Sequence, residues 1–165
     1  MQSFRISRRV FTQSIGAIPI ASMLATDADA QSREVTELLA AVTDLIVPRD
    51  EGPSASDLKV HARIVANART IPNYPQLLSE GLGWLEMRAR EDHQVRFLAL
   101  AQDLQADILG EAFAAREMTL PFVFAHRIRE DVLSHYYRDA RAWVGLGFYG
   151  PIQPNGYSDF TDPPA

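Results

Sequence analysis

The chain has 165 residues, carries a net charge of −5 and contains no cysteine. A chain of this length can bury an apolar core as one domain without cross-links. The missing cysteine excludes disulfides, thiolate metal sites, iron–sulfur clusters and covalent attachment of a c-type haem. The acidic balance is unfavourable for binding nucleic acid or an anionic membrane surface.

The chain begins with the pattern of an export signal. Arg8 and Arg9, with Ser7 before them and Phe11 after them, are typical of a twin-arginine signal, which directs the export of folded proteins. The apolar run that follows, residues 15–25, has about half the length that a membrane span requires. Export to the periplasm by the twin-arginine route is therefore expected, with the general secretory route and a cytoplasmic chain with a basic tail as alternatives.

A cleavage site follows the apolar run. Ala28 and Ala30 form the small-residue A-x-A arrangement that a signal peptidase recognises. We expect cleavage after Ala30, so that residues 1–30 are a signal peptide and the mature chain begins at Gln31.

The mature chain shows helical periodicity as far as residue 138. Apolar residues at i, i+3, i+4 and i+7 predict helices over residues 32–47, 56–69, 76–90, 94–116 and from 119 onward. Ser32 and Thr119 are candidate N-caps, and Pro121 is tolerable because it lies in a first turn. No segment alternates with period two for long enough to form a strand. The sequence therefore predicts an all-α fold, a small bundle of about five helices over residues 31–138.

The core of this bundle is predicted from the same spacing. The inward-facing positions include Leu38, Leu39, Val42, Leu58, Ile64, Leu78, Leu82, Leu85, Phe97, Leu98, Ala101, Leu104, Ile108, Phe113, Phe124, Ile128 and Val132.

Residues 139–165 differ in kind from the rest of the chain. This segment is rich in glycine and proline, which favour irregular structure, but it also contains several large aromatic side chains. Disordered tails are usually poor in aromatic residues. We therefore expect an irregular tail that docks either on its own bundle or on a partner.

The sequence contains no recognisable catalytic or cofactor motif. The glycines of residues 145–150 follow a helix instead of a strand, so they do not form a dinucleotide-binding turn. His126 and His135 lie nine residues apart on one predicted helix and point in opposite directions, so they cannot share a metal ion. Ser134 and His135 are adjacent, which does not place a nucleophile beside a base. We expect no catalytic residue, metal or cofactor here. Because the usual reason for export in the folded state is a cofactor loaded in the cytoplasm, we infer that the cofactor belongs to another protein.

The order of motifs resembles a known family. The signal is followed by a helix ending in "LIVPRDEGPSA", then by "GLGWLEMRAR", and then by "FVFAHRIREDVLSHYY" leading into "GLGFYGPIQPNGY". This order resembles the small subunit, subunit 3, of the gluconate 2-dehydrogenase family. Ser134 stands where a glycine is typical of that family.

The resemblance implies a non-catalytic subunit of a larger complex. In such systems the small subunit pairs with a large FAD-containing subunit of the glucose–methanol–choline oxidoreductase type. That subunit oxidises gluconate, another sugar or the 3-hydroxyl of a glycoside, and passes electrons to a cytochrome c that holds haem. The small subunit then supplies the export signal, folding and stability, and meets a membrane only through partners.

Eight residues are candidates for the interface with the flavin subunit. They are Arg127, Arg129, Tyr136, Tyr137, Trp143, Phe148, Tyr149 and Tyr157. Aromatic and arginine side chains are the usual anchors of interfaces. The alternative is that the rings pack only on their own helices. Two other classes stay open at this point, a free-standing periplasmic binding or chaperone protein and an independent enzyme.

Overall fold

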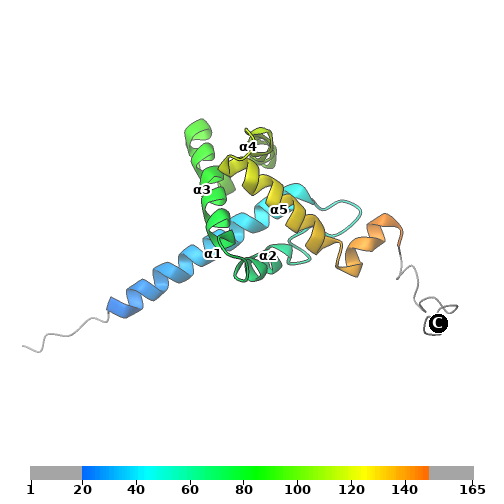
Figure 1. Cartoon of the computed structure of the whole chain (residues 1–165), viewed down its shortest axis with the longest axis horizontal. Coiled ribbons are helices and arrows are strands. Elements are labelled where there is room, and N and C mark those ends of the chain that lie inside the picture. The colour runs from blue at the N-terminus through cyan, green and yellow to red at the C-terminus, as the bar shows by residue number, and fades with distance from the viewer. Residues whose placement is uncertain (1–19, 149–165) are drawn as a thin grey trace, which may run out of the picture.

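The computed structural model of the protein describes residues 20–148, and of residues 20–31 the backbone alone. Five α-helices and two 3₁₀-helices make up the described chain (Figure 1). They are α1 (Ile20–Ile46), α2 (Val60–Ala68), α3 (Tyr74–His93), η1 (Phe97–Ala99), α4 (Gln102–Ala114), α5 (Leu120–Tyr136) and η2 (Ala140–Leu146). This part of the chain contains no strand, which confirms the predicted all-α fold.

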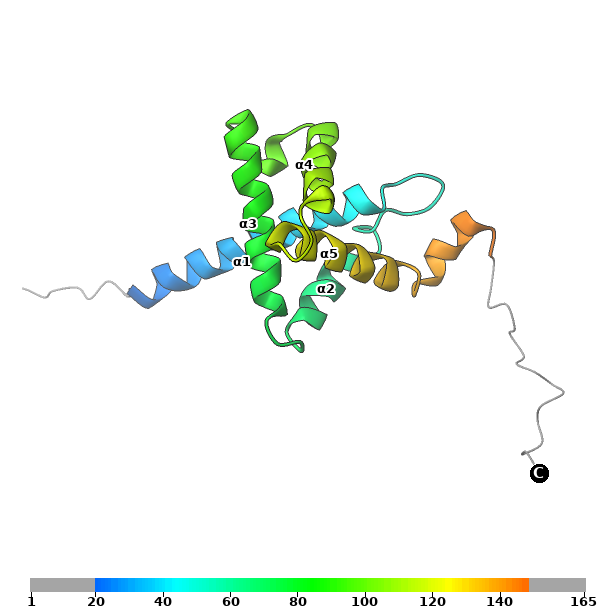
Figure 2. The same cartoon turned by 45° about the horizontal axis from the view of Figure 1, so that its top comes forward.

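Helix α5 is the centre of the bundle, because it packs against each of the other four α-helices and makes the most extensive contacts of the five. Phe124, Ile128 and Val132 on its inner face are fully buried, as their spacing predicts. Helices α3 and α4 run side by side, and α1 and α5 run across them (Figure 2). Pro121 lies in the first turn of α5, where its missing N–H removes no helical hydrogen bond.

Helix α1 is longer than the sequence pattern predicts. It begins at Ile20, continues through the predicted cleavage point after Ala30, and ends at Ile46. The prediction that Ser32 is an N-cap is wrong, because Ser32 lies inside the helix, where its carbonyl accepts a hydrogen bond of 2.8 Å from the Thr36 hydroxyl. The first part of α1 extends away from the other helices, and its last turns bury Leu38, Leu39 and Val42 in the core (Figure 1).

The helix predicted over residues 94–116 is also wrong, because two elements occupy that stretch. Gln94 takes a left-handed backbone conformation, with φ 60°, and ends α3. Phe97 then inserts into the core in η1, where the buried Gln105 side chain donates to its carbonyl at 2.9 Å. Leu98 and Ala101, which the continuous helix would have turned inward, are exposed. The burial of one large ring therefore interrupts the helical pattern.

The predicted irregular tail begins with a regular element. Residues 140–146 form η2, which ends at Gly147 with φ 76°. Asp139 caps this helix by accepting from the backbone N–H of Arg141 at 3.2 Å. Within residues 20–148, no helix combines the length and the apolar character needed to cross a membrane.

Candidate functional site

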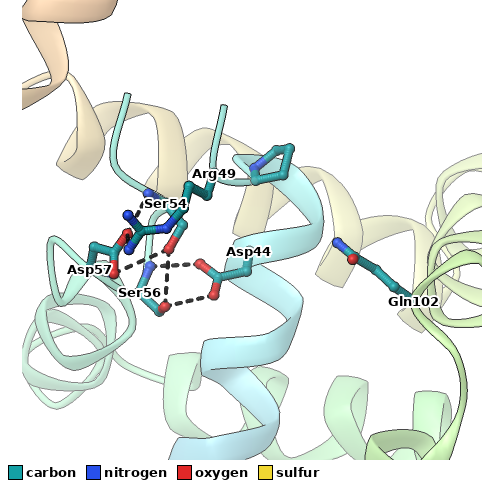
Figure 3. Close-up of a pocket in the computed structure, with 7 residues that line it drawn as sticks. Asp44, Arg49, Ser54, Ser56, Asp57 and Gln102 are labelled. Atoms are coloured by element: carbon teal, nitrogen blue, oxygen red, sulfur yellow. Dashed lines mark hydrogen bonds and ion pairs between the residues drawn. The ribbon is translucent and has the colours of Figure 1, made fainter. Parts of the chain in front are cut away.

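The loop that joins α1 to α2, residues 47–59, is held in its conformation by hydrogen bonds to side chains of the loop and of α1. Asp44 on the last turns of α1 accepts from the Ser56 backbone N–H at 2.7 Å and from the Ser56 hydroxyl at 2.6 Å. The backbone N–H of Ala55 donates to the Val47 carbonyl at 3.1 Å and closes the loop at its base. These contacts hold the "GPSA" segment against the end of α1 (Figure 3).

A second carboxylate, Asp57, organises the outer part of the same loop. Its oxygen accepts from the Ser54 backbone N–H at 2.8 Å and from the Arg49 guanidinium at 2.5 Å. The Ser54 hydrogen bond and the positive charge of Arg49 hold the pKa of Asp57 below its usual range. Asp57 therefore stays ionised near neutral pH and is unsuited to act as a general acid.

These side chains line a polar depression of about 480 Å³. Its wall is completed by Pro48 and by Gln102 at the start of α4 (Figure 3). Asp44 and Asp57 already accept hydrogen bonds from the loop, so they stabilise its conformation. Within residues 32–148, no group of three or more His, Asp or Glu side chains is placed to hold a metal ion.

The opposite side of the loop rests on the end of α5. The Tyr136 hydroxyl donates to the Pro53 carbonyl at 2.8 Å, and the Tyr136 side chain is buried. A Cβ atom on Gly52 would lie 3.2 Å from the Tyr136 oxygen, so this approach is close enough to favour glycine. On η2, Gly145 also approaches this backbone, since a Cβ atom on it would lie 3.6 Å from the Gly52 nitrogen. The loop is therefore held between α1 and the end of α5.

Two arginines and one aspartate attach η2 to α2. Arg63 on α2 donates to the His135 carbonyl at 3.2 Å and to Asp139 at 2.9 Å. Arg141 donates to both oxygens of Asp139, at 2.9 and 2.8 Å. Hydrogen bonds from the Arg141 side chain, with a further one from Arg63, hold the pKa of Asp139 well below its usual range.

The structure separates the predicted interface residues into inward and outward groups. Tyr136 lies in the core. Trp143 packs against that core, and the Trp143 indole N–H donates to the Tyr137 carbonyl at 2.8 Å. The Tyr137 and Phe148 side chains are exposed, at 45% and 49%. The alternative in which the rings pack on their own helices therefore applies to Trp143. Phe148 instead lies on the surface.

The two predicted interface arginines on α5 stack on aromatic rings of this chain. Arg127 lies over the Tyr74 ring, 4.5 Å from its centre, and donates to Asp131 at 3.0 Å. Arg129 lies over the Phe113 ring at 5.7 Å and stays exposed. The remaining predicted residues, Arg8, Arg9, Phe11, Tyr149 and Tyr157, lie outside the described residues.

Sequence reasoning did not identify the residues that build the loop. Asp44 and Ser56 are twelve positions apart, and Tyr136 is 83 positions from Pro53. The only available signal was the serine and aspartate content of residues 54–57 directly after Gly52 and Pro53, which is typical of side-chain capped turns.

The fold and the loop define a small all-helical protein built around an ordered polar loop. The family model for gluconate 2-dehydrogenase subunit 3 matches residues 33–154, which is most of the chain. The chain therefore belongs to the gluconate 2-dehydrogenase subunit 3 family, as the order of its motifs predicts. The family is one of enzyme subunits, which implies partner subunits. No curated protein and no solved structure matches the chain.

Proposed function

We propose that the protein is the non-catalytic small subunit of a periplasmic FAD-dependent dehydrogenase. The large subunit holds the FAD and oxidises gluconate, another sugar or the 3-hydroxyl of a glycoside, and a cytochrome c accepts the electrons. The small subunit carries the twin-arginine signal for both chains and supports folding and stability of the flavin subunit. The family match over residues 33–154 is the observation that carries this proposal.

An exposed apolar surface supports the role of a subunit. Tyr137, Val144, Leu146 and Phe148 are between 45% and 55% exposed, and all lie at the end of α5 or on and just after η2. Soluble monomers rarely leave several large apolar side chains exposed together, whereas subunit interfaces bury them.

Co-expression tests the proposal. A flavoprotein with a dinucleotide-binding fingerprint and no signal peptide is expected to be encoded beside this chain, and both are produced together with an affinity tag on this chain only. We expect the flavoprotein to co-purify with bound FAD and to reduce an artificial acceptor with gluconate, other sugars or glycosides. This chain purified alone is expected to give no turnover. Recovery of the tagged chain alone, or turnover by it alone, would contradict the proposal.

A further inference from the structure

One face of α2 and the start of η2 border an open groove of about 450 Å³. Its lining residues are Asp57, Leu58, Lys59, Ala62, Arg63, Ala66 and Arg141. Lys59 precedes α2 in a left-handed conformation with φ 56°, and it is exposed.

Positive charge exceeds negative charge in this groove, although the chain as a whole carries −5. Lys59, Arg63 and Arg141 are its cations. Asp57 is paired with Arg49, and Asp139, beside the groove, is shared by Arg63 and Arg141. Lys59 takes part in none of the ion pairs formed among the described residues. An acidic ligand would therefore meet uncompensated cations at this face.

The two guanidinium groups are held in place and still have donors to offer. The Asp139 side chain, only 12% exposed, pairs with the guanidinium groups of both Arg63 and Arg141 and fixes their orientation. Arg63 and Arg141 are 40% and 65% exposed, and each uses only part of the five N–H donors of a guanidinium within the chain. A guanidinium oriented in this way binds a carboxylate with little further ordering.

Apolar surface continues from the cations along η2. Side chains three positions apart lie on the same face of a 3₁₀-helix, so Val144, which is 52% exposed, follows Arg141 on one face. Leu146, two positions further, lies on another face and lines a separate depression with Gly52, Tyr136 and Tyr137. A small anion would find only exposed donors in so open a groove, whereas a protein segment can cover both the cations and Val144.

We infer that the groove between α2 and η2 is a docking surface for an acidic segment of the partner subunit, in which carboxylates lie next to apolar side chains. The inference depends on the proposed function for the existence of that subunit, and it assigns the contact to Lys59, Arg63 and Arg141.

A charge variant and a matched control test the docking surface. The double variant Lys59→Glu, Arg141→Gln keeps Arg63, which attaches η2 to α2. We expect it to weaken binding to the flavin subunit by about 10- to 100-fold and to reduce the salt dependence of binding. The control Arg116→Glu, Arg33→Gln makes the same change in net charge at exposed positions on α1 and just after α4, elements that do not line the groove, and is expected to bind as the wild type does.

Binding is measured by titrating the purified flavin subunit at several salt concentrations, and folding of each variant is checked by circular dichroism. A wild-type chain that does not bind would overturn the proposed function and the docking surface together. Wild-type binding with unchanged binding by the groove variant would overturn the docking surface alone. Equal weakening by the control would also overturn it, because net charge would then be the cause. Tight binding of inorganic phosphate that only the groove variant loses, with no loss of subunit binding, would identify a small-anion site instead.

Discussion

Tyr136 and Tyr137 are neighbours in sequence and have different surroundings. Their rings meet edge to face, with centres 5.1 Å apart. Tyr136 is buried, which raises the pKa of its hydroxyl, and that hydroxyl donates to the Pro53 carbonyl. Tyr137 is 45% exposed. The first tyrosine therefore belongs to the support of the loop over residues 47–59, and the second belongs to the surface.

Replacing each tyrosine by phenylalanine separates these two roles. Tyr136→Phe removes one hydrogen bond to the loop, so we expect the free energy of unfolding to fall by about 1 kcal/mol. Tyr137→Phe, the matched control, is expected to leave it unchanged. Urea denaturation followed by circular dichroism measures both. Equal stability of the two variants would show that the Pro53 contact contributes nothing.

His61 on α2 carries a buried polar atom, since its Nδ1 is shielded from solvent and has no hydrogen-bond partner among the described residues. Burial lowers the pKa of His61, while the negative charge of Asp44 opposes that change. The unfolded chain then binds a proton more readily than the folded chain at pH values just below about 6.5.

Stability is therefore expected to depend on pH through His61. The contribution is fully present above about pH 6.5, the pKa of an unfolded histidine, and is lost as the pH falls through the lower pKa of the folded state. Urea denaturation of the wild type and of His61→Gln between pH 8 and pH 5 measures the free energy of unfolding of each. On acidification, unfolding of the wild type is expected to take up at most about one proton more than unfolding of the variant. A variant that loses stability on acidification as steeply as the wild type would rule out His61 as the source.

At the scale of elements, the crossing of α3 and α5 depends on one glycine. A Cβ atom placed on Gly81 would lie 2.1 Å from the ring of Phe124, which is fully buried. No side chain larger than hydrogen fits there without moving one of the helices. Gly83, two positions along α3, has open space where its Cβ would be.

The two glycines make a matched pair of substitutions. Gly81→Ala is expected to lower the free energy of unfolding by about 1–3 kcal/mol, because the core is overpacked. Gly83→Ala is expected to raise it by about 0.5–1 kcal/mol, because alanine favours an exposed helix. Urea denaturation midpoints compare the variants with the wild type. A Gly81→Ala variant as stable as Gly83→Ala would mean that the helices move apart at little cost.

Local pattern predicted the elements that are locally determined. Helices α3 and α5 start within two residues of their predicted positions, because Pro75 and Pro121 mark first turns and the apolar period is regular. The break between Gln94 and Gln102 could not be predicted, because it depends on the burial of Phe97 against distant helices.

The same reason limits what the sequence reveals about the site. One pairing of the loop joins Asp44 to Ser56, twelve positions apart, and one pairing at the groove joins Arg63 to Asp139, 76 positions apart. Composition shows that such groups exist, but only the fold shows that they meet. The start of η2 was missed because glycine content suggested irregular structure, whereas Asp139 provides a cap.

At the scale of the whole molecule, the proposed export role means that the signal on this chain directs the export of both subunits. Replacing Arg8 and Arg9 by lysine is expected to leave the flavin subunit's dehydrogenase activity in the cytoplasm, because the twin-arginine pair is the recognised feature. Activity is assayed in periplasmic and cytoplasmic fractions, with Arg5→Lys as the control that keeps the pair. Activity of the double lysine variant in the periplasm at the wild-type level would assign the export signal to another protein.

The loop over residues 47–59 has a further consequence for how this molecule meets other proteins. Its backbone is fixed by Asp44, Asp57 and Tyr136 before any partner arrives. Conformational entropy that a flexible loop would lose on association is here lost during folding. A protein that contacts this loop therefore meets a preformed surface, and its association needs no disorder-to-order step. The heat-capacity change of such an association would reflect the apolar area that is buried, without a contribution from coupled folding.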